Sequence, residues 1–192
     1  GRDVTVVRLP DSGVRSADVD EFVAGRDWVT LRDEQRVIPS LLFTSGTTGR
    51  PKAVQLPPKT IGDTPTLAGF LAHAKAYKFA SMGTHLVAGP LYHNGPLTAV
   101  RLLICGVPVV VPSRFDAEGT LAAIAEHKVE TSIMVPTHFV RMLALDPEVR
   151  ACYSTSSLKS VSHTGGACPI DVKRAMIEWW GPVLSESYGG TE

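Results

Sequence analysis

The sequence has few cysteines, no excess of either charge and no long apolar run, and each of these absences excludes a class of protein. Its three cysteines are odd in number and lack CxxC spacing, which argues against a disulfide scaffold or a zinc site and favours a reduced, cytoplasmic location. The formal net charge is +0 and the basic residues are dispersed, so neither nucleic acid nor an anionic membrane surface is an expected partner. The apolar runs have the length of strands, so we expect no membrane span.

The 192 residues are 44% hydrophobic, which is enough to bury the core of one or two α/β units. Short β-branched runs alternate with helix-patterned stretches, and this alternation predicts an α/β fold, a mostly parallel sheet wrapped by helices. Asp116 and Asp171 are typical of helix starts. The expected strands are Val4–Val7, Ile38–Phe43, His85–Ala88, Val107–Val111, Thr131–Val135, Leu158–Ser162 and Val183–Glu186. The expected helices are Val19–Ala24, Leu67–Phe79, Pro96–Ile104, Ala117–His127, Thr137–Leu145 and Asp171–Trp179.

The most informative segment is residues 41–52, Leu-Leu-Phe-Thr-Ser-Gly-Thr-Thr-Gly-Arg-Pro-Lys. An apolar strand runs into hydroxyl and glycine residues, which supply donors and let the backbone approach an anion, and Lys52 adds a positive charge. This predicts a phosphate-binding loop; the alternative is an ordinary flexible surface loop. It is not the P-loop of NTPases, because Gly49 is followed by Arg50-Pro51 instead of Lys-Ser/Thr at a helix start.

Three further segments follow in order: Gly-Pro-Leu-Tyr-His-Asn-Gly at 89–95, Thr-Gly-Gly-Ala-Cys-Pro at 164–169 and Glu-Ser-Tyr-Gly-Gly-Thr-Glu at 186–192. Together with the loop they resemble the signature segments of the adenylate-forming superfamily, which contains acyl-CoA and aryl-CoA ligases, luciferases, fatty-acyl-AMP ligases and peptide-synthetase adenylation domains. The resemblance implies that 36–192 form the AMP-binding core and that 1–35 open the same large domain. It also implies that a downstream barrel portion and a small C-terminal domain are absent, so we expect a piece of a longer enzyme.

The placement of these segments agrees with a shared site. Each follows an expected strand, and ligands of open parallel sheets bind beyond the carboxyl ends of the strands. We therefore expect the four segments to converge on one cleft.

By the resemblance, the reaction is attack of a carboxylate on the α-phosphorus of ATP, followed by transfer of the acyl group from AMP to CoA. A carboxylate is already ionised at neutral pH, so catalysis needs positioning and charge neutralisation rather than a general base. The implied cofactors are ATP, Mg²⁺ and CoA as co-substrate, and the implied partner is a small carboxylic acid.

The resemblance also assigns roles to residues. Tyr188 is expected to stack on adenine, Thr191 to bond the α-phosphate, and Thr44 and Glu192 to hold magnesium. His93, Lys52 and Thr191 are the expected catalytic residues. The alternatives are an ordinary strand-to-helix turn at 165–167 and a buried structural tyrosine at 188. The expected ATP- and AMP-binding residues are Thr44, Ser45, Gly46, Thr47, Thr48, Gly49, Lys52, Gly165, Gly166, Ala167, Glu186, Ser187, Tyr188, Gly189 and Thr191.

The second segment indicates the type of ligase. Amino-acid-activating domains typically carry Phe-Asp where this chain has Tyr92-His93, so the resemblance favours a fatty or related acid and a role in fatty-acid or lipid metabolism. His93 is expected to lie between the acyl carboxylate and the path of CoA. The polarity of Asn94 and His163 favours a ringed or oxygenated acyl chain. The expected acyl pocket is lined by His93, Asn94, Leu97, Val100, Thr137, Phe139, His163 and Gly190.

Two other functions stay open: an acyl-AMP ligase or carrier-loading enzyme that does not use CoA, and a nucleotide-binding module without chemistry. For the chain alone we expect little or no turnover, because the family's ribose-binding aspartate and catalytic lysine have no counterpart here. Losing one charge-stabilising group typically costs about 10²–10³ in rate. Exposed apolar surface would also favour association, so an oligomer of this chain is not expected to be a native assembly.

Overall fold

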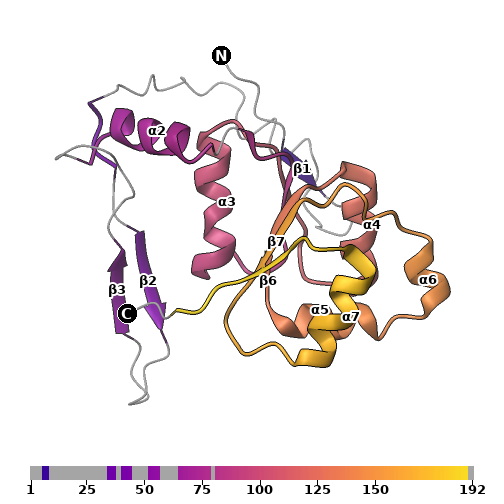
Figure 1. Cartoon of the computed structure of the whole chain (residues 1–192). Coiled ribbons are helices and arrows are strands. Elements are labelled where there is room, and N and C mark those ends of the chain that lie inside the picture. The colour runs from indigo at the N-terminus through magenta and orange to yellow at the C-terminus, as the bar shows by residue number, and fades with distance from the viewer. Residues whose placement is uncertain are drawn as a thin grey trace.

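The computed structural model describes residues 6–8, 34–37, 40–44, 52–56, 65–78 and 81–189. Within these ranges the strands form two sheets (Figure 1). The first has six strands in the order β1-β5-β4-β6-β7-β8, and every neighbouring pair is parallel. The second is an antiparallel pair, β2-β3. The α/β prediction of a mostly parallel sheet is confirmed.

The strands of the parallel sheet are β1 (Val6–Arg8), β4 (His85–Val87), β5 (Val109–Val111), β6 (Thr131–Met134), β7 (Ser160–His163) and β8 (Leu184–Glu186). The separate pair is β2 (Ser40–Thr44) and β3 (Lys52–Leu56). The helices are α2 (Leu67–Ala76), α3 (Asn94–Ile104), α4 (Ala117–His127), α5 (Pro136–Leu143), α6 (Pro147–Ala151) and α7 (Ile170–Trp180).

Helices cover both faces of the parallel sheet, as Figure 1 shows for α2 and α3 on one side and α4, α5 and α7 on the other. Adjacent residues of a strand point to opposite faces, and the buried side chains divide accordingly. Leu86 and Val110 belong to the cluster with α4, α5 and α7, whereas Val87 and Val109 belong to the cluster with α2 and α3. The two hydrophobic cores therefore sandwich β4 and β5, which is why these short strands are apolar throughout.

Helix α4 begins and ends at the residues predicted for it. The Asp116 carboxylate accepts a hydrogen bond of 2.6 Å from the Gly119 N–H and so caps the helix. Lys128, in the left-handed conformation with φ 49°, ends it. Asp171 lies in the first turn of α7, as expected, where a negative charge favours the helix dipole.

Other predictions differ from the structure at their ends. Val135 was expected in a strand but is the N-cap of α5, because Pro136 at the first helical position starts a helix readily. Strand β7 begins at Ser160, later than expected, because Leu158 belongs to the preceding turn, in which its N–H donates to the Thr155 carbonyl. Strand β3 and helix α6 were not expected at all. The expected helix Val19–Ala24 lies outside the described residues.

Candidate functional site

Strands β4, β6, β7 and β8 are parallel, so they end at the same edge of the sheet. We call this the carboxyl edge and define it by residues 88–94, 135–137, 164–168 and 186–189, which follow or end these strands. Backbone hydrogen bonds link its segments: Thr164 N–H donates to the Met134 carbonyl at 3.1 Å, and Ser187 N–H donates to the His163 carbonyl at 2.9 Å. The carboxyl edge thus gathers residues from the second, third and fourth sequence segments.

The chain leaves β4 and its neighbour β6 in opposite directions. Helix α3, which follows β4, packs on one face of the sheet, and α5, which follows β6, packs on the other. Such a divergence is the topological switch point at which open α/β sheets form a ligand crevice. Gly95 lies here, and a Cβ atom on it would stand 3.0 Å from Ile133 Cγ2 of β6. A side chain at 95 would therefore require Ile133 to shift by a few tenths of an ångström.

Polar and aromatic side chains at the carboxyl edge are exposed. Tyr92 is 74% exposed and its ring lies 4.6 Å from that of His93, which is the N-cap of α3. Tyr188, beyond β8, is fully exposed. Gly165 has φ +83°, a conformation that side-chain-bearing residues rarely adopt, and it turns the backbone at the end of β7. The edge therefore offers free aromatic faces beside exposed backbone.

The end of β8 is fixed from two sides. Lys173 of α7 donates a hydrogen bond to Glu186 Oε2 and forms an ion pair with it. This hydrogen bond lowers the pKa of Glu186. On the other side, the Ser162 and Ser187 hydroxyls are 3.2 Å apart. The residues just before Tyr188 are consequently held against both α7 and β7.

Two residues predicted for the acyl pocket are buried under the carboxyl edge. Phe139 is 0% exposed and lies in the core, with its ring 5.5 Å from that of His163 in an edge-on arrangement. His163 is 1% exposed, burial lowers its pKa, and its Nδ1 has no hydrogen-bond partner among the described residues. Neither side chain faces open space, so Phe139 supports the edge from the core rather than lining a pocket at its surface.

The other predicted pocket residues lie nearer the surface, on two helices. Asn94 and Val100 on α3 are exposed, Leu97 on α3 is half-buried, and Thr137 at the start of α5 is exposed. Because α3 and α5 cover opposite faces, these residues approach one another only at the switch point. Their role as an acyl pocket stays a prediction, and Gly190 lies outside the described residues.

The phosphate loop is described only at its two ends. Thr44 ends β2 and pairs with Lys52, which begins β3, so the strand pair holds the ends of residues 45–51 together. Lys52 therefore opens a strand, whereas the lysine of a P-loop stands at the start of a helix. The predicted nucleotide ligands Ser45, Gly46, Thr47, Thr48 and Gly49, and Thr191 and Glu192, lie outside the described residues.

Comparison with known proteins decides the family. A family model described as AMP-binding enzyme matches residues 9–192. The chain belongs to the AMP-binding enzyme family. The resemblance to adenylate-forming enzymes, expected from four short segments, is thereby confirmed over nearly the whole chain.

Its relatives in the AMP-binding family include acid–CoA ligases. The chain is 33% identical over 190 residues to 2-succinylbenzoate--CoA ligase of Bacillus velezensis, covering 95% of this chain and 36% of that protein. It is 32% identical over 192 residues to feruloyl-CoA synthase of Amycolatopsis sp, covering 97% of this chain and 35% of that protein. It is 32% identical over 165 residues to long-chain-fatty-acid--CoA ligase of Bacillus subtilis, covering 83% of this chain and 28% of that protein. The chain thus spans about a third of the length of these relatives.

Solved structures show the same fold. The o-succinylbenzoate CoA synthetase of Bacillus subtilis in complex with the acyl-adenylate intermediate OSB-AMP matches 84% of this chain and 31% of that chain, with TM-score 0.58 and 27% identity. The amide bond synthetase McbA of Marinactinospora thermotolerans matches 79% of this chain and 29% of that chain, with TM-score 0.60 and 24% identity. At that lower identity the second likeness concerns the fold alone.

In this AMP-binding chain the magnesium prediction is not tested. Of its two expected ligands, Glu192 and the side chain of Thr44 lie outside what the structure describes. Among the residues that it does describe, no group of three or more His, Cys, Asp or Glu side chains can hold a metal ion. In the same part of the chain, no helix is long and apolar enough to cross a membrane.

Sequence reasoning missed Lys173, whose ion pair with Glu186 lies at the carboxyl edge. We expect Lys173→Met to raise the pKa of Glu186, because the carboxylate then loses the donor that favours its charged form. An NMR titration of the glutamate side-chain carboxyl signals measures this directly. The matched control is Lys159→Met, which removes the ion pair of Lys159 with Glu130 at 2.8 Å and leaves Glu186 untouched. A Glu186 titration that is the same in both variants would mean that the ion pair is not formed in solution.

Proposed function

We propose that this chain forms the nucleotide-binding part of an AMP-forming acid–CoA ligase. The observation that carries the proposal is the meeting of the second, third and fourth signature segments at the carboxyl edge, within a chain that belongs to the AMP-binding family. The exposed ring of Tyr188 offers a face for adenine, and the exposed turn at Gly165 follows the neighbouring strand β7. The loop 45–51 would hold the phosphates, with Lys52 at its base.

The reaction proposed for the complete gene product begins with attack of a carboxylate oxygen on the α-phosphorus of ATP and loss of pyrophosphate. The thiol of CoA then attacks the acyl carbon, and AMP leaves. Magnesium, when bound, would offset charge on the phosphates. This chain's own contribution is binding and orientation: Tyr188 for the base, and His93, exposed at the start of α3, at the entrance used by the acyl carboxylate and by CoA.

The proposed acid is a fatty or related carboxylic acid with a ring or oxygen functions near the reacting end. Asn94 and His93 are exposed polar groups beside the switch point, which a plain alkyl chain does not require. The relatives named for 2-succinylbenzoate and ferulate support a ring, and the relative named for long-chain fatty acids keeps an alkyl acid within the class. We propose a cytoplasmic enzyme in which the chain alone binds nucleotide without turnover.

Removing the ring of Tyr188 tests the nucleotide site. We expect Tyr188→Ala to weaken AMP binding by about 10- to 100-fold, since stacking of a base on an aromatic ring contributes roughly 1–3 kcal/mol. Tyr188→Phe keeps the ring and should bind nearly as well as the unchanged chain. Tyr77→Ala, which removes a 64% exposed tyrosine of the turn after α2, is the matched control. Calorimetric titration with AMP measures all four, and an alanine variant that binds like the control would exclude Tyr188 from the site.

The complete gene product tests the reaction. It is assayed for ATP–pyrophosphate exchange with benzoate, cinnamate and alkanoate acids, and in parallel for thioester formation with CoA. Acid-dependent exchange with thioester formation supports the ligase and ranks ring acids against alkyl acids. Exchange without thioester identifies an acyl-AMP ligase or carrier-loading enzyme, and AMP binding without any exchange identifies a nucleotide-binding module.

A further inference from the structure

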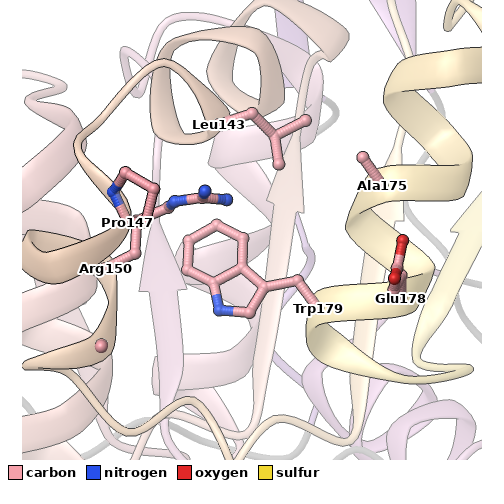
Figure 2. A pocket seen from close by; sticks show the side chains of 7 residues that line it. Leu143, Pro147, Arg150, Ala175, Glu178 and Trp179 are labelled. Atoms are coloured by element: carbon pink, nitrogen blue, oxygen red, sulfur yellow. The ribbon is translucent and has the colours of Figure 1, made fainter.

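A pocket lies away from the carboxyl edge, among α5, α6 and α7 (Figure 2). Its lining includes Leu143 at the end of α5 and Trp179 near the end of α7. Both helices start at the carboxyl edge, so their last turns lie toward the edge where the strands begin. The 11 residues of α7 span roughly 16 Å, which separates this pocket from the candidate nucleotide site.

The pocket has an aromatic wall and one cation. Figure 2 shows the Trp179 ring facing the space between Leu143 and Ala175, with the Arg150 side chain reaching over it. The Arg150 Cζ atom lies 5.1 Å from the centre of the Trp179 ring, a cation–π arrangement that fixes the guanidinium. Pro147 and Ala151 of α6 complete the wall on the arginine side. The pocket volume of about 400 Å³ suits a small molecule.

The Arg150 guanidinium lies over Trp179 but has no carboxylate partner within the described part of the chain. Its Nε is buried and has no hydrogen-bond partner there, and no ion pair among the described residues includes its guanidinium. A buried donor of a charged group without an acceptor is costly. The planar fork of a guanidinium matches a carboxylate, which can accept two parallel hydrogen bonds from it.

We propose that this pocket binds a small aromatic monocarboxylate, with its ring on Trp179 and its carboxylate on Arg150. The ring replaces water on an indole face and on the side chains of Leu143 and Ala175. The carboxylate pairs with the Arg150 guanidinium, which has no ion-pair partner among the described residues. This site is separate from the proposed nucleotide site and does not depend on the ligase activity.

Glu178 makes the pocket selective for a single negative charge. Its exposed carboxylate lies on the α7 side of the pocket, away from Arg150 (Figure 2). A ligand with a second carboxylate would place it near Glu178, where like charges repel. A dicarboxylate of the same shape is therefore expected to bind more weakly than the monocarboxylate.

The test uses the 192-residue chain and 3-phenylpropionate as the probe. The chain has three tryptophans, Trp28, Trp179 and Trp180, and a Trp179→Phe variant assigns the indole N–H signal of Trp179 in a ¹H–¹⁵N spectrum. We expect 3-phenylpropionate to shift this signal with a Kd on the order of 1 mM, the range typical of so small a ligand. Phenylsuccinate, a dicarboxylate, and 3-phenylpropanol, which is uncharged, should each shift it only at clearly higher concentrations.

Variants separate this pocket from any binding elsewhere. Arg150→Gln should weaken binding of 3-phenylpropionate about tenfold or more, because the charged hydrogen bond is lost. Ala175→Leu fills the pocket while keeping Arg150 and should abolish the shift of Trp179. Glu178→Gln should bring phenylsuccinate close to 3-phenylpropionate in affinity. Arg174→Gln removes an exposed arginine next to Ala175 that does not line the pocket, and should leave binding unchanged.

The outcomes decide the proposal. A Trp179 shift that Ala175→Leu abolishes and Arg150→Gln weakens supports it. If Trp179 does not shift at about tenfold above the expected Kd, or if both variants bind like Arg174→Gln, the pocket does not bind aromatic monocarboxylates. Should Arg150→Gln fail to fold, Arg150→Lys, which keeps the charge but loses the fork, replaces it, and Ala175→Leu tests the pocket independently.

Discussion

Replacing Phe139 with alanine is expected to lower the free energy of unfolding of this chain by about 3–5 kcal/mol. The ring is completely buried and is the largest fully buried side chain of the described core. It contacts the rings of Trp180, at 6.0 Å, and His163, at 5.5 Å, both nearly perpendicular to it. Its removal would leave a cavity between α5 and α7, and the core rarely collapses to fill such a space.

The neighbouring residue supplies the control. Val140 follows Phe139 on α5 but is 45% exposed, so Val140→Ala should change the unfolding free energy far less. Urea unfolding followed by circular dichroism compares the two variants. Equal losses in both would contradict the burial of Phe139. Because His163 precedes the segment 164–168, we also expect Phe139→Ala to weaken AMP binding, which the exposed valine variant should not do.

Acidification is expected to destabilise the chain between about pH 6.5 and pH 4. His85 is 3% exposed, and desolvation by burial lowers its pKa from 6.5 to about 4. Its Nδ1 is 2.9 Å from the Thr131 hydroxyl, while its Nε2 is buried without a partner in the described structure. The unfolded chain binds a proton on this group at higher pH than the folded chain does. The contribution of neutral His85 to the free energy of unfolding is therefore fully present above pH 6.5. It is lost as the pH falls toward 4, which lowers the free energy of unfolding by about 3 kcal/mol.

His138 is also expected to destabilise the folded chain as the pH falls. Burial and the nearby charge of Arg141 lower its pKa to about 4, while its ring stacks on Phe115 at 4.1 Å. Its Nδ1 accepts a hydrogen bond from the Val135 N–H at 3.3 Å, which the protonated ring cannot do. The predicted loss of stability is checked by the unfolding midpoint in urea of the chain and of His85→Gln, measured at about pH 7.5, 6, 5 and 4.5. The glutamine variant should lose less stability on acidification, whereas His93→Gln, which removes an exposed histidine, should behave like the unchanged chain.

Local patterns predicted much of the fold because they depend on adjacent residues. The cap at Asp116 and the apolar spacing after it located α4 at both ends, and the alternation of strands and helices indicated the parallel sheet. Strand β3 was missed because Lys52 was interpreted as the end of a phosphate loop, although the residues after it alternate as a strand does. Only pairing with β2 reveals that the loop is closed by two antiparallel strands.

The candidate site was predicted unevenly for a similar reason. The segments at 89–95, 164–169 and 186–192 are recognisable from the sequence. Tight turns and close approach of the backbone to a ligand require particular residues, such as glycine, at successive positions. Phe139 carries no such signal, because the sequence pattern of an amphipathic helix is the same whether its phenylalanine faces a ligand or the core. Lys173 was missed because its partner Glu186 belongs to another element.

The sequence by itself thus determined the family, the alternating α/β pattern and the segments that carry the proposed chemistry, since each is recorded in consecutive residues. The tertiary structure alone decided the strand order, and with it the switch point between β4 and β6. It also decided the burial of Phe139 and His163, the Lys173–Glu186 pair and the pocket of Arg150 and Trp179. These features join residues from different elements, and which residues meet depends on how whole helices and strands pack rather than on any local pattern.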